Sequence, residues 1–347
     1  MQGLKKVLLI RFSSIGDIVL TTPVVRCIKE QTGAEIHFLT KKSYQSILDP
    51  NPHISKVWAL NDNFKELIQQ LKKEKYELII DLHKNLRSLN FKRQLGIPSR
   101  SFDKINIQKW LMVKLKWNRL PDRHIVARYL DTTKDWTIEY DGKGLDYFIP
   151  QDQELDPAEL AERYFSHQEI LRAAVAEQQY VALVIGAAHA TKRLPEEKII
   201  SIAKAIKHPV FLLGGPAEKE QGARIAQAAG QQVINTCGAL QLHQSTSLVR
   251  QAAVVISHDT GMMHIAAAFN KDIISIWGNT IPAFGMYPFF AKGQGSNTIV
   301  QVNQLSCRPC SKIGYDQCPK GHFKCMQQID ESRIVGKVQE ILGNHRA

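Results

Sequence analysis

The chain has 347 residues, of which 44% are hydrophobic and 22% are charged. This length predicts about two domains, and this composition excludes a disordered or fibrous chain. No apolar run approaches the roughly 20 residues that span a bilayer, and Arg11 interrupts the run that starts at Val7, so we exclude a membrane-spanning protein and expect a cytoplasmic one.

Short apolar runs alternate with helical runs along the chain. Their continuous apolar character is typical of parallel strands covered on both faces, and the alternation predicts two doubly wound α/β units. The expected strands are residues 5–11, 35–39, 56–59 and 78–81 in the first unit, and residues 180–185, 210–213, 233–235, 254–257 and 273–277 in the second. The expected helices are one that follows the first strand through Glu30, and residues 63–73, 196–206, 218–229 and 242–251.

A polar, helix-like stretch over residues 156–176 separates the two series. We therefore expect an N-terminal Rossmann-like domain over residues 1–155 and a C-terminal one over residues 156–347, which includes a cysteine-containing segment. Two such domains that face each other across a cleft place ligands at the carboxyl ends of their strands.

Positive charge is concentrated in the N-terminal half. The net charge is +12; residues 1–150 hold 26 basic and 16 acidic side chains, and residues 84–128 hold twelve basic side chains against Asp103 and Asp122 alone. Such a field favours an anionic partner, which could be nucleic acid, a membrane surface or an acidic substrate. Residues 109–117 interleave Trp110 and Trp117 with lysines, which suits either a membrane interface or a core helix with its lysines outside.

The first strand-to-helix junction runs from Arg11 to Asp17. Gly16 allows a tight turn that exposes backbone amides near a helix start, where negative charge is favoured. Asp17 has two interpretations: an acid that stabilises the start of the helix, or a carboxylate that accepts a proton in a reaction.

Two junctions in the second unit suggest nucleotide chemistry. Small residues at 186–190 precede Lys192 and Arg193, which is typical of phosphate binding but also of a surface loop. Gly214, Gly215 and Glu218 follow the next strand, and an acid in this place can hold ribose hydroxyls. The chain contains neither G-x-G-x-x-G nor a P-loop, so a dinucleotide dehydrogenase and a P-loop phosphotransferase lose support.

The last junction, residues 257–268, combines a polar turn with an alanine-rich helix. Thr260 and Gly261 would form an anion-binding helix start suited to a diphosphate. Met262 is more typical of packing, and His264 is either a core histidine or a contact to the anion.

Together these junctions resemble the heptosyltransferases of lipopolysaccharide core assembly, glycosyltransferase family nine, over nearly the whole chain. The most specific matches are RFSSIGDIVLTTPVV at residues 11–25 and SHDTGMMHIAAA at residues 257–268. The resemblance implies the GT-B architecture, with the acceptor on the N-terminal domain and the nucleotide sugar on the C-terminal one. It implies Asp17 as the general base and a donor site of Thr191, Lys192, Glu218, Asp259, Thr260, Gly261, Met262 and His264.

The acceptor of this family is an acidic lipid-linked sugar, which fits the basic N-terminal half. Lys84 and Arg87 follow the strand that ends at Asp81 and could pair with acceptor carboxylates, and Ser14 and Gly16 are the other acceptor-site candidates. The function implied is an inverting transfer of a heptose or related sugar from an ADP-sugar to the inner core of lipopolysaccharide, at the inner face of the cytoplasmic membrane. The chain has no D-x-D triplet at a strand end, so no metal is indicated as a required cofactor.

Two other functions compete with this one. A basic nucleic-acid-binding protein is supported by charge alone, without an RRM, KH or zinc-finger signature, so we expect no nucleic-acid partner. A non-catalytic, membrane-associated sugar-binding protein is the second alternative.

Four of the six cysteines lie close together near the C-terminus. Cys307, Cys310, Cys318 and Cys325 follow the spacing C-x2-C-x7-C-x6-C, which is compact enough for a structural zinc ion and equally compatible with free thiols in a loop. Cys27 and Cys237 are expected to be ordinary buried thiols.

Overall fold

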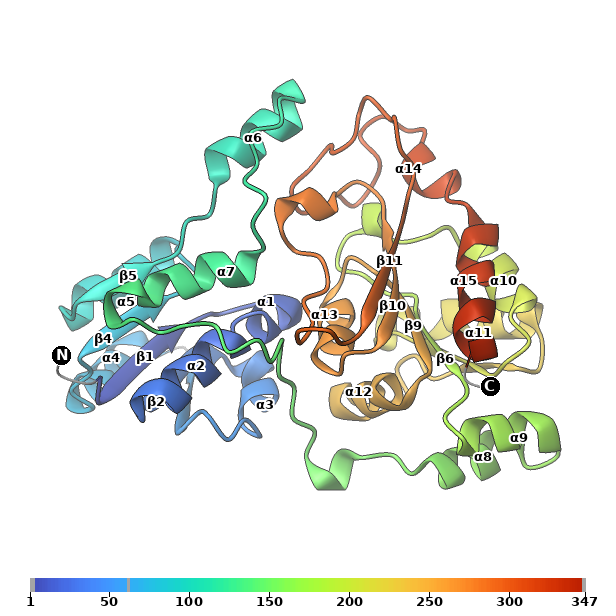
Figure 1. Ribbon diagram of the computed structural model, residues 1–347, viewed down its shortest axis with the longest axis horizontal. Coiled ribbons are helices and arrows are strands. Elements are labelled where there is room, and N and C mark those ends of the chain that lie inside the picture. The colour runs from blue at the N-terminus through green and yellow to red at the C-terminus, as the bar shows by residue number, and fades with distance from the viewer. Residues whose placement is uncertain (1–3, 61–62, 345–347) are drawn as a thin grey trace. The chain divides into compact units, whose positions relative to one another are not determined.

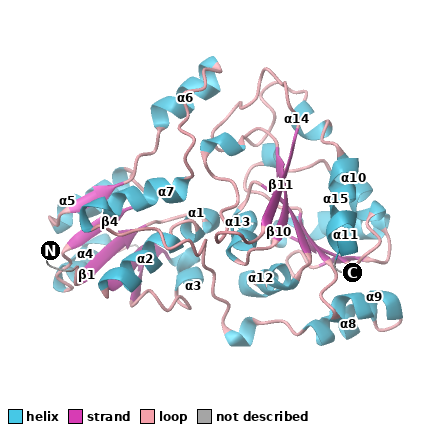
Figure 2. Cartoon of the chain, in the orientation of Figure 1, coloured by secondary structure: helices cyan, strands magenta, loops and turns pink. Residues whose placement is uncertain are grey.

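The computed structural model describes residues 4–60 and 63–344, and these form two compact units (Figures 1 and 2). Unit 1 runs to Asn106 and resumes over Pro121–Phe148; unit 2 comprises Ile107–Leu120 and the chain from Ile149 onward. Each unit contains one all-parallel sheet with helices packed against it, so the prediction of two doubly wound α/β units is confirmed.

The sheet of unit 1 has the strand order β3-β2-β1-β4-β5. Its central strand is fully buried from Val7 to Ile10, and a cluster of apolar side chains from α4 and α5 covers one face. The strands are β1 (Lys6–Ile10), β2 (Glu35–Lys41), β3 (Lys56–Leu60), β4 (Leu78–Asp81) and β5 (Ser99–Ser101). The helices are α1 (Ile15–Val19), α2 (Thr22–Thr32), α3 (Gln45–Leu48), α4 (Phe64–Lys73), α5 (Leu86–Leu95) and α7 (Ile125–Leu130).

The sheet of unit 2 has the order β11-β10-β9-β6-β7-β8, and α10, α11 and α15 contribute to the apolar cluster on one face. The strands are β6 (Val181–Val184), β7 (Val210–Leu213), β8 (Val233–Asn235), β9 (Val254–His258), β10 (Asp272–Trp277) and β11 (Ser296–Gln301). The helices are α6 (Asn106–Leu115), α8 (Pro157–Phe165), α9 (Glu169–Ala176), α10 (Glu196–Ala205), α11 (Lys219–Ala229), α12 (Leu242–Gln251), α13 (Gly261–Ala268), α14 (Lys324–Gln327) and α15 (Glu331–Asn344).

Both sheets have a topological switch point, where the strand order reverses. In unit 1 it lies between β1 and β4, and in unit 2 between β6 and β9. Open α/β sheets bind their ligands outside the carboxyl ends of the strands at this point. The switch point of unit 1 carries the junction Arg11–Asp17 and the acceptor candidates Lys84 and Arg87, and that of unit 2 carries the junctions at residues 186–195 and 257–268.

Two expected helices are interrupted. The helix predicted through Glu30 is split into α1 and α2, because the Thr21 and Thr22 hydroxyls donate to the carbonyls of Ile18 and Val19, and Pro23 in the first turn of α2 has no N–H to continue α1. The stretch over 156–176 is likewise split into α8 and α9.

Two edge strands were not predicted from the sequence. Strands β5 and β11 carry the sequences SRS and SNTIVQ, and both pair on one side only. Edge strands are half solvated, so they lack the continuous apolar run that marked the central strands.

Helix α6 corrects one interpretation of the basic segment. It contains no buried residue, and Ile107 and Trp110 are 74% and 54% exposed, so it is not a core helix with lysines outside. Among the described residues, no helix is both long enough and apolar enough to span a membrane.

Candidate functional site

An ion pair between a buried arginine and the predicted base lies at the carboxyl end of β1. Arg11 Nη2 is 2.6 Å from Asp17 Oδ1, and the two side chains are 10% and 21% exposed. The other nitrogens of Arg11 donate to the carbonyl of Ser13 (2.8 Å), the carbonyl of Leu82 (2.5 Å) and the Tyr129 hydroxyl (3.1 Å). Because Leu82 directly follows β4, the guanidinium connects the two strand ends at the switch point of unit 1.

Asp17 also lies at the start of α1. Its Oδ2 accepts hydrogen bonds from the Ser14 hydroxyl (2.9 Å) and the Ser14 backbone N–H (3.2 Å). Ser14 itself is exposed, whereas Gly16 is buried and its carbonyl accepts from Leu20. The geometry therefore supports the helix-stabilising interpretation of Asp17, while its role as a base stays a prediction.

The surroundings keep Asp17 ionised. Burial by itself would raise the pKa of the carboxyl, but the Arg11 guanidinium and the two Ser14 hydrogen bonds outweigh it, so the pKa lies below its ordinary value. At neutral pH Asp17 is a carboxylate that can accept a proton.

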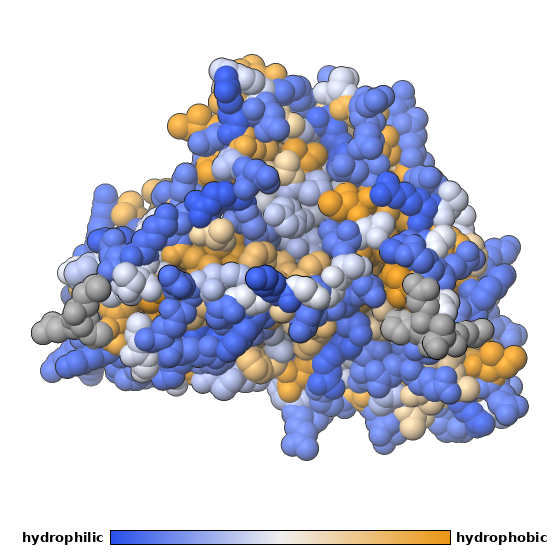
Figure 3. Space-filling model, in the orientation of Figure 1, coloured by the Kyte–Doolittle hydropathy of each residue, from blue (hydrophilic) through white to orange (hydrophobic). Residues whose placement is uncertain are grey.

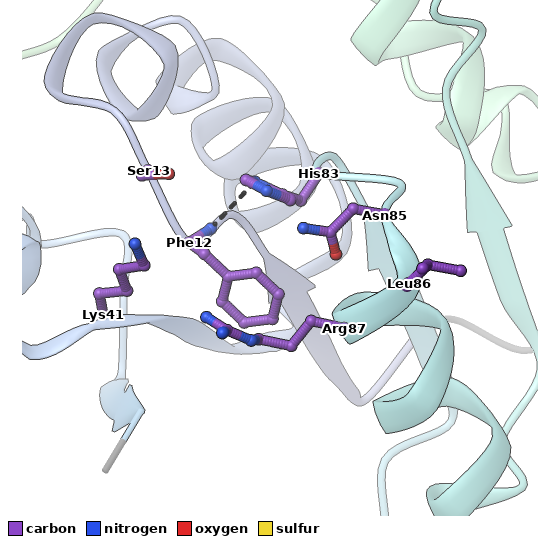
Figure 4. Close-up of a pocket in the computed structure, with 7 residues that line it drawn as sticks. All are labelled: Phe12, Ser13, Lys41, His83, Asn85, Leu86 and Arg87. Atoms are coloured by element: carbon purple, nitrogen blue, oxygen red, sulfur yellow. Dashed lines mark hydrogen bonds between the residues drawn. The ribbon is translucent and has the colours of Figure 1, made fainter. Parts of the chain in front are cut away.

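An open pocket of about 380 Å³ adjoins this loop (Figure 4). In Figure 4 Lys41 extends from the end of β2 and Arg87 from the first turn of α5, and the Arg87 guanidinium carbon lies 6.0 Å from the centre of the Phe12 ring. Among the described residues, the lining contains these two cations and no carboxylate. The lining residues are Phe12, Ser13, Lys41, His83, Asn85, Leu86 and Arg87.

The structure brings one predicted acceptor residue to this pocket and adds others. Arg87 lines it, whereas Lys84 is exposed on the same turn but is not a lining residue. Lys41 was missed, although it ends β2 and the strand-end rule that selected Lys84 would have selected it too. His83 lines the pocket as a neutral ring, because burial and then the Arg11 charge lower its pKa to about 4.

A buried carboxylate organises the turn that carries these residues. Asp81, at the end of β4, is 0% exposed, and its Oδ1 accepts from the backbone N–H groups of His83 (3.1 Å) and Lys84 (2.7 Å). Its Oδ2 accepts from the Ser88 hydroxyl (2.8 Å) and pairs with Lys92 (3.0 Å). Nothing in the sequence distinguishes this aspartate from any other at a strand end.

The switch point of unit 2 contains a second ion pair. Lys192 Nζ is 2.7 Å from Asp259 Oδ2 and donates to the Asp259 carbonyl at 3.2 Å, and the two side chains are 17% and 13% exposed. Lys192 follows β6 and Asp259 follows β9, so the fold joins two predicted donor residues that are 67 positions apart. Among the described residues, these contacts occupy two of the three ammonium protons, which leaves one for a ligand.

Glu218 is held between two strand ends. Its Oε2 accepts from the backbone N–H of Gly215 (2.9 Å), and its Oε1 is 3.3 Å from Arg193 Nη1. A Cβ on Gly214 would lie 2.8 Å from the Glu218 Cβ, and one on Gly186 would lie 3.1 Å from its carboxyl group. These glycines are therefore required for close approach. Arg193 belongs to the phosphate-binding pattern named from the sequence, but its contact with Glu218 was not predicted.

Helix α13 begins where the sequence predicts an anion-binding helix start. Its N-cap residue Thr260 makes no capping bond to the helix and instead lies 3.2 Å from the Ser257 hydroxyl, so it leaves the first-turn amides uncapped. Met262 is partly exposed on the first turn and His264 is buried. Thr191 is 2% exposed, and its hydroxyl is hydrogen-bonded to the backbone of Tyr315.

The described cysteines form no disulfide, and Cys27 and Cys237 are buried as expected. Cys307 Sγ lies 3.7 Å from His322 Nε2, but no three cysteine or histidine ligand atoms of this segment lie within 4.8 Å of one another. As arranged, the described thiols do not form a tetrahedral zinc site, whose sulfur atoms lie about 3.8 Å apart. Zinc therefore stays a prediction, and no step of the chemistry depends on it.

Among the described residues, three side chains of the kinds that bind metal ions lie close together: Glu35, His37 and Glu74. Lysines already neutralise its carboxylates, because Lys6 contacts both glutamates at 3.1 and 3.0 Å and Lys56 contacts Glu74 at 2.8 Å. The group lies at the amino ends of β1 to β3, remote from the switch point, and we assign it an ion-pair role.

Two doubly wound sheets with charged groups and helix starts at their switch points are the architecture of GT-B glycosyltransferases. Comparison with known proteins places the chain within that class. The pattern of glycosyltransferase family 9 (heptosyltransferase) matches residues 64–319, so the chain belongs to this family.

Individual proteins resemble the chain over nearly its whole length. Lipopolysaccharide heptosyltransferase 1 of Campylobacter coli is 24% identical, over 98% of this chain and 99% of that protein. A glycosyl transferase family 9 structure from Veillonella parvula has a TM-score of 0.75 at 18% identity and covers 99% of both chains. The E. coli ADP-heptose lps heptosyltransferase II has a TM-score of 0.71 at 19% identity, over 99% of this chain and all of its own. Both solved structures share the fold.

Proposed function

We propose that this heptosyltransferase moves a heptose from ADP-heptose to the acidic inner core of lipopolysaccharide, with inversion at the anomeric carbon. The observation that carries the proposal is the Lys192–Asp259 pair beside the start of α13, at the switch point of unit 2. The names of the relatives support the substrates: the Campylobacter coli protein is a lipopolysaccharide heptosyltransferase, and the E. coli structure is described as an ADP-heptose enzyme.

The proposed reaction is a single displacement. The oxygen of an acceptor hydroxyl attacks the anomeric carbon from the face opposite the diphosphate, and its proton passes to the Asp17 carboxylate. The bond between the anomeric carbon and the diphosphate oxygen breaks, and ADP leaves with the bonding electrons. Asp17 suits this role because its low pKa keeps it ionised and a fifth of its side chain is exposed.

The donor would occupy the carboxyl edge of the unit 2 sheet. The remaining proton of Lys192 and the first-turn amides of α13, with Thr260 and Gly261, would stabilise the charge that grows on the leaving diphosphate. Glu218 would accept hydrogen bonds from the ribose hydroxyls. Met262 and His264 would complete this site from the same helix.

The acceptor would occupy the pocket of unit 1. Lys41 and Arg87 give it two cations that can pair with sugar carboxylates, and Lys84 lies on the same turn. Ser14 and Gly16 would border the reacting hydroxyl beside Asp17. The cationic lining therefore matches an acidic acceptor.

The lipid-linked acceptor would require the enzyme to work at the inner face of the cytoplasmic membrane, and α6 with the following turn is our candidate contact. Leu115 and Trp117 are 58% and 50% exposed, beside Trp110 and Ile107, and the space-filling view shows apolar side chains gathered over α6 (Figure 3). The Arg119 guanidinium lies 4.4 Å from the Trp117 ring centre. Exposed tryptophan beside cationic groups suits an anionic membrane interface.

The base is tested with Asp17→Asn, which retains an oxygen for the Ser14 contacts but removes the charge. We expect turnover to fall by roughly 10²–10⁴-fold with ADP affinity nearly unchanged. Asp156→Asn is the matched control, because Asp156 likewise caps a helix, α8, outside both sites. Equal losses in turnover and in ADP affinity would make Asp17 a structural residue.

The donor is tested by calorimetry with ADP, UDP and GDP. We expect ADP to bind most tightly, and tighter binding of UDP or GDP would refute an ADP-sugar donor. Metal analysis of the same preparation tests the zinc prediction, which a stoichiometry near zero in folded protein would refute.

Membrane contact is tested by sedimentation with vesicles of phosphatidylglycerol. The double variant Trp110→Ser with Trp117→Ser should bind about tenfold more weakly, and added salt should weaken the wild type. Ile170→Ser is the control, because Ile170 is 82% exposed on α9, far along the chain from this segment. Unchanged binding by the double variant would refute the assignment.

A further inference from the structure

The segment that carries the first two clustered cysteines is tied to the turn after β10. Arg308 donates from Nε to the Gly278 carbonyl and from Nη2 to the Thr280 carbonyl (2.9 Å), and the Cys310 N–H donates to the Asn279 carbonyl (3.3 Å). Three successive carbonyls of one turn thus accept from residues about 30 positions later. Figure 1 shows β10 and β11, which precede this turn and this segment.

The Arg308 guanidinium also makes hydrogen bonds at the end of β11. Arg308 Nη1 donates to the Val302 carbonyl (2.9 Å), and Nη2 also donates to Gln301 Oε1 (2.7 Å) at the end of β11. The planar fork of an arginine side chain can serve several acceptors in one fixed geometry, which a lysine cannot reproduce. Arg308 therefore clamps the turn after β10 to the end of β11.

The clamped turn reaches the donor-site ion pair directly. The Thr280 hydroxyl donates to Asp259 Oδ2 at 2.8 Å, and the same oxygen is 2.7 Å from Lys192 Nζ. The turn also packs closely, since a Cβ on Gly278 would lie 2.8 Å from the Thr191 carbonyl. A shift of the turn would therefore move Asp259 and, through it, the ammonium of Lys192.

Tyr315, a few residues further along the same segment, holds Thr191, the residue next to Lys192. Thr191 exchanges hydrogen bonds with the backbone of Tyr315, whose N–H donates to the Thr191 hydroxyl at 2.9 Å and whose carbonyl accepts from the Thr191 N–H at 3.1 Å. The Tyr315 hydroxyl donates in turn to the Cys310 carbonyl at 3.1 Å. The segment thus contacts the loop after β6, which contributes Lys192, and the turn after β10, whose Thr280 reaches Asp259.

We propose that residues 307–315, which we term the cysteine segment, are a positioning element of the donor site, with Arg308 as its principal positioning residue. Arg308 touches no substrate; it holds Thr280, which orients Asp259, which orients Lys192 toward the leaving diphosphate. The inference rests on the proposed function, because it takes the Lys192–Asp259 pair to be part of the nucleotide-sugar site. It holds whether or not the cysteines bind a metal.

The test compares Arg308→Gln with Arg224→Gln in the full-length protein. Arg224 pairs with Glu196 on the surface, 2.7 Å away, and contacts neither the turn nor the cysteine segment. We expect Arg308→Gln to raise both the ADP Kd and the donor KM by roughly 10–100-fold, since small displacements of a catalytic group have effects of this size. The acceptor KM should stay within about twofold, and Arg308→Lys should not restore donor binding.

Thr280→Val provides a second route that keeps the cysteine segment attached. It removes only the hydroxyl that reaches Asp259, so it should reproduce the weaker ADP binding in a protein with a near-normal unfolding midpoint. Because both variants interrupt one chain of contacts, the double variant should weaken ADP binding no more than the stronger single variant does.

The outcomes separate the two proposals. If Lys192→Met weakens ADP binding but Arg308→Gln and Thr280→Val do not, the inference is overturned and the proposed function stands. If the effects of Arg308→Gln and Thr280→Val simply add, the proposed chain of contacts is also refuted. If wild-type protein binds no ADP, the proposed function fails, and this inference fails with it.

Discussion

Replacing Arg11 with methionine should move the pH dependence of this enzyme in a defined direction. In the wild type, the guanidinium 2.6 Å from Asp17 brings the pKa of the carboxyl below its ordinary value. Without the guanidinium, burial becomes the dominant influence and raises that pKa. In the proposed reaction the Asp17 carboxylate must be ionised, so activity should disappear as the pH falls through this pKa, and the variant should lose activity at a higher pH than the wild type.

The size of the effect follows from the contacts of Arg11. Its side chain is 10% exposed and donates to four acceptors, so removing it should lower the free energy of unfolding by about 3 kcal/mol, the lower end for a broken buried ion pair, because Asp17 keeps its two Ser14 hydrogen bonds. At neutral pH the less constrained carboxylate should lower kcat/KM by roughly 10–100-fold. The acid limb of the variant should therefore lie at higher pH than that of the wild type, so the ratio of variant to wild-type activity should fall as the pH is lowered.

The assay is kcat/KM for ADP release between about pH 4 and pH 8, with urea unfolding measured at each pH. Tyr129→Phe is the matched control, because it removes one hydrogen bond to Arg11 Nη1 and leaves the ion pair intact. Its acid limb should coincide with that of the wild type. An unchanged acid limb in Arg11→Met would refute Asp17 as the group that governs the rate.

Three further predictions concern single residues. Lys192→Met should lower kcat/KM for the donor by roughly 10²–10³-fold, measured by ADP release, because it removes a cation from the leaving group; a loss below tenfold would contradict this role. Gly214→Ala should lower the free energy of unfolding by about 1–3 kcal/mol and weaken ADP binding, because its Cβ would lie 2.8 Å from that of Glu218; normal stability in urea would count against the close packing. Since the pKa of His83 is lowered to about 4, His83→Gln should leave the pH profile between about pH 6 and pH 7 unchanged and raise only the acceptor KM; an inflection in the wild type that this variant abolishes would exclude a neutral ring.

Local patterns in the sequence were sufficient for the central elements of the fold. The runs at β4 and β7 match the predicted bounds, because a strand buried on both faces must be continuously apolar. The edge strands β5 and β11 carry no such requirement and were missed. The break between α1 and α2 was not predicted either. It depends on hydrogen bonds from the Thr21 and Thr22 hydroxyls to backbone carbonyls, which hydrophobic periodicity does not show.

The residues of the candidate site also fall into two groups: those that the sequence could select and those that only the structure shows. The strand-end rule selected Asp17, Lys192 and Glu218, because glycine, charge and helix-start residues are visible in a local window, and the family resemblance added Asp259. The same rule applied to every strand would have added Lys41, which ends β2. No local window could have selected Arg308, which acts on the donor site only through the turn after β10, whose carbonyls lie about 30 positions earlier in the chain.

The amino-acid sequence alone determined the two α/β units and the residue types at each strand end, since these depend on short-range patterns. Its motifs at residues 11–25 and 257–268 carried the resemblance to the family. The tertiary structure decided which of those residues meet. Arg11 reaches Leu82, and Lys192 reaches Asp259, only because β1 lies beside β4 and β6 lies beside β9. Strand order in a parallel sheet is set by how the helical crossovers pack, and this is a long-range property that no segment of the chain carries by itself.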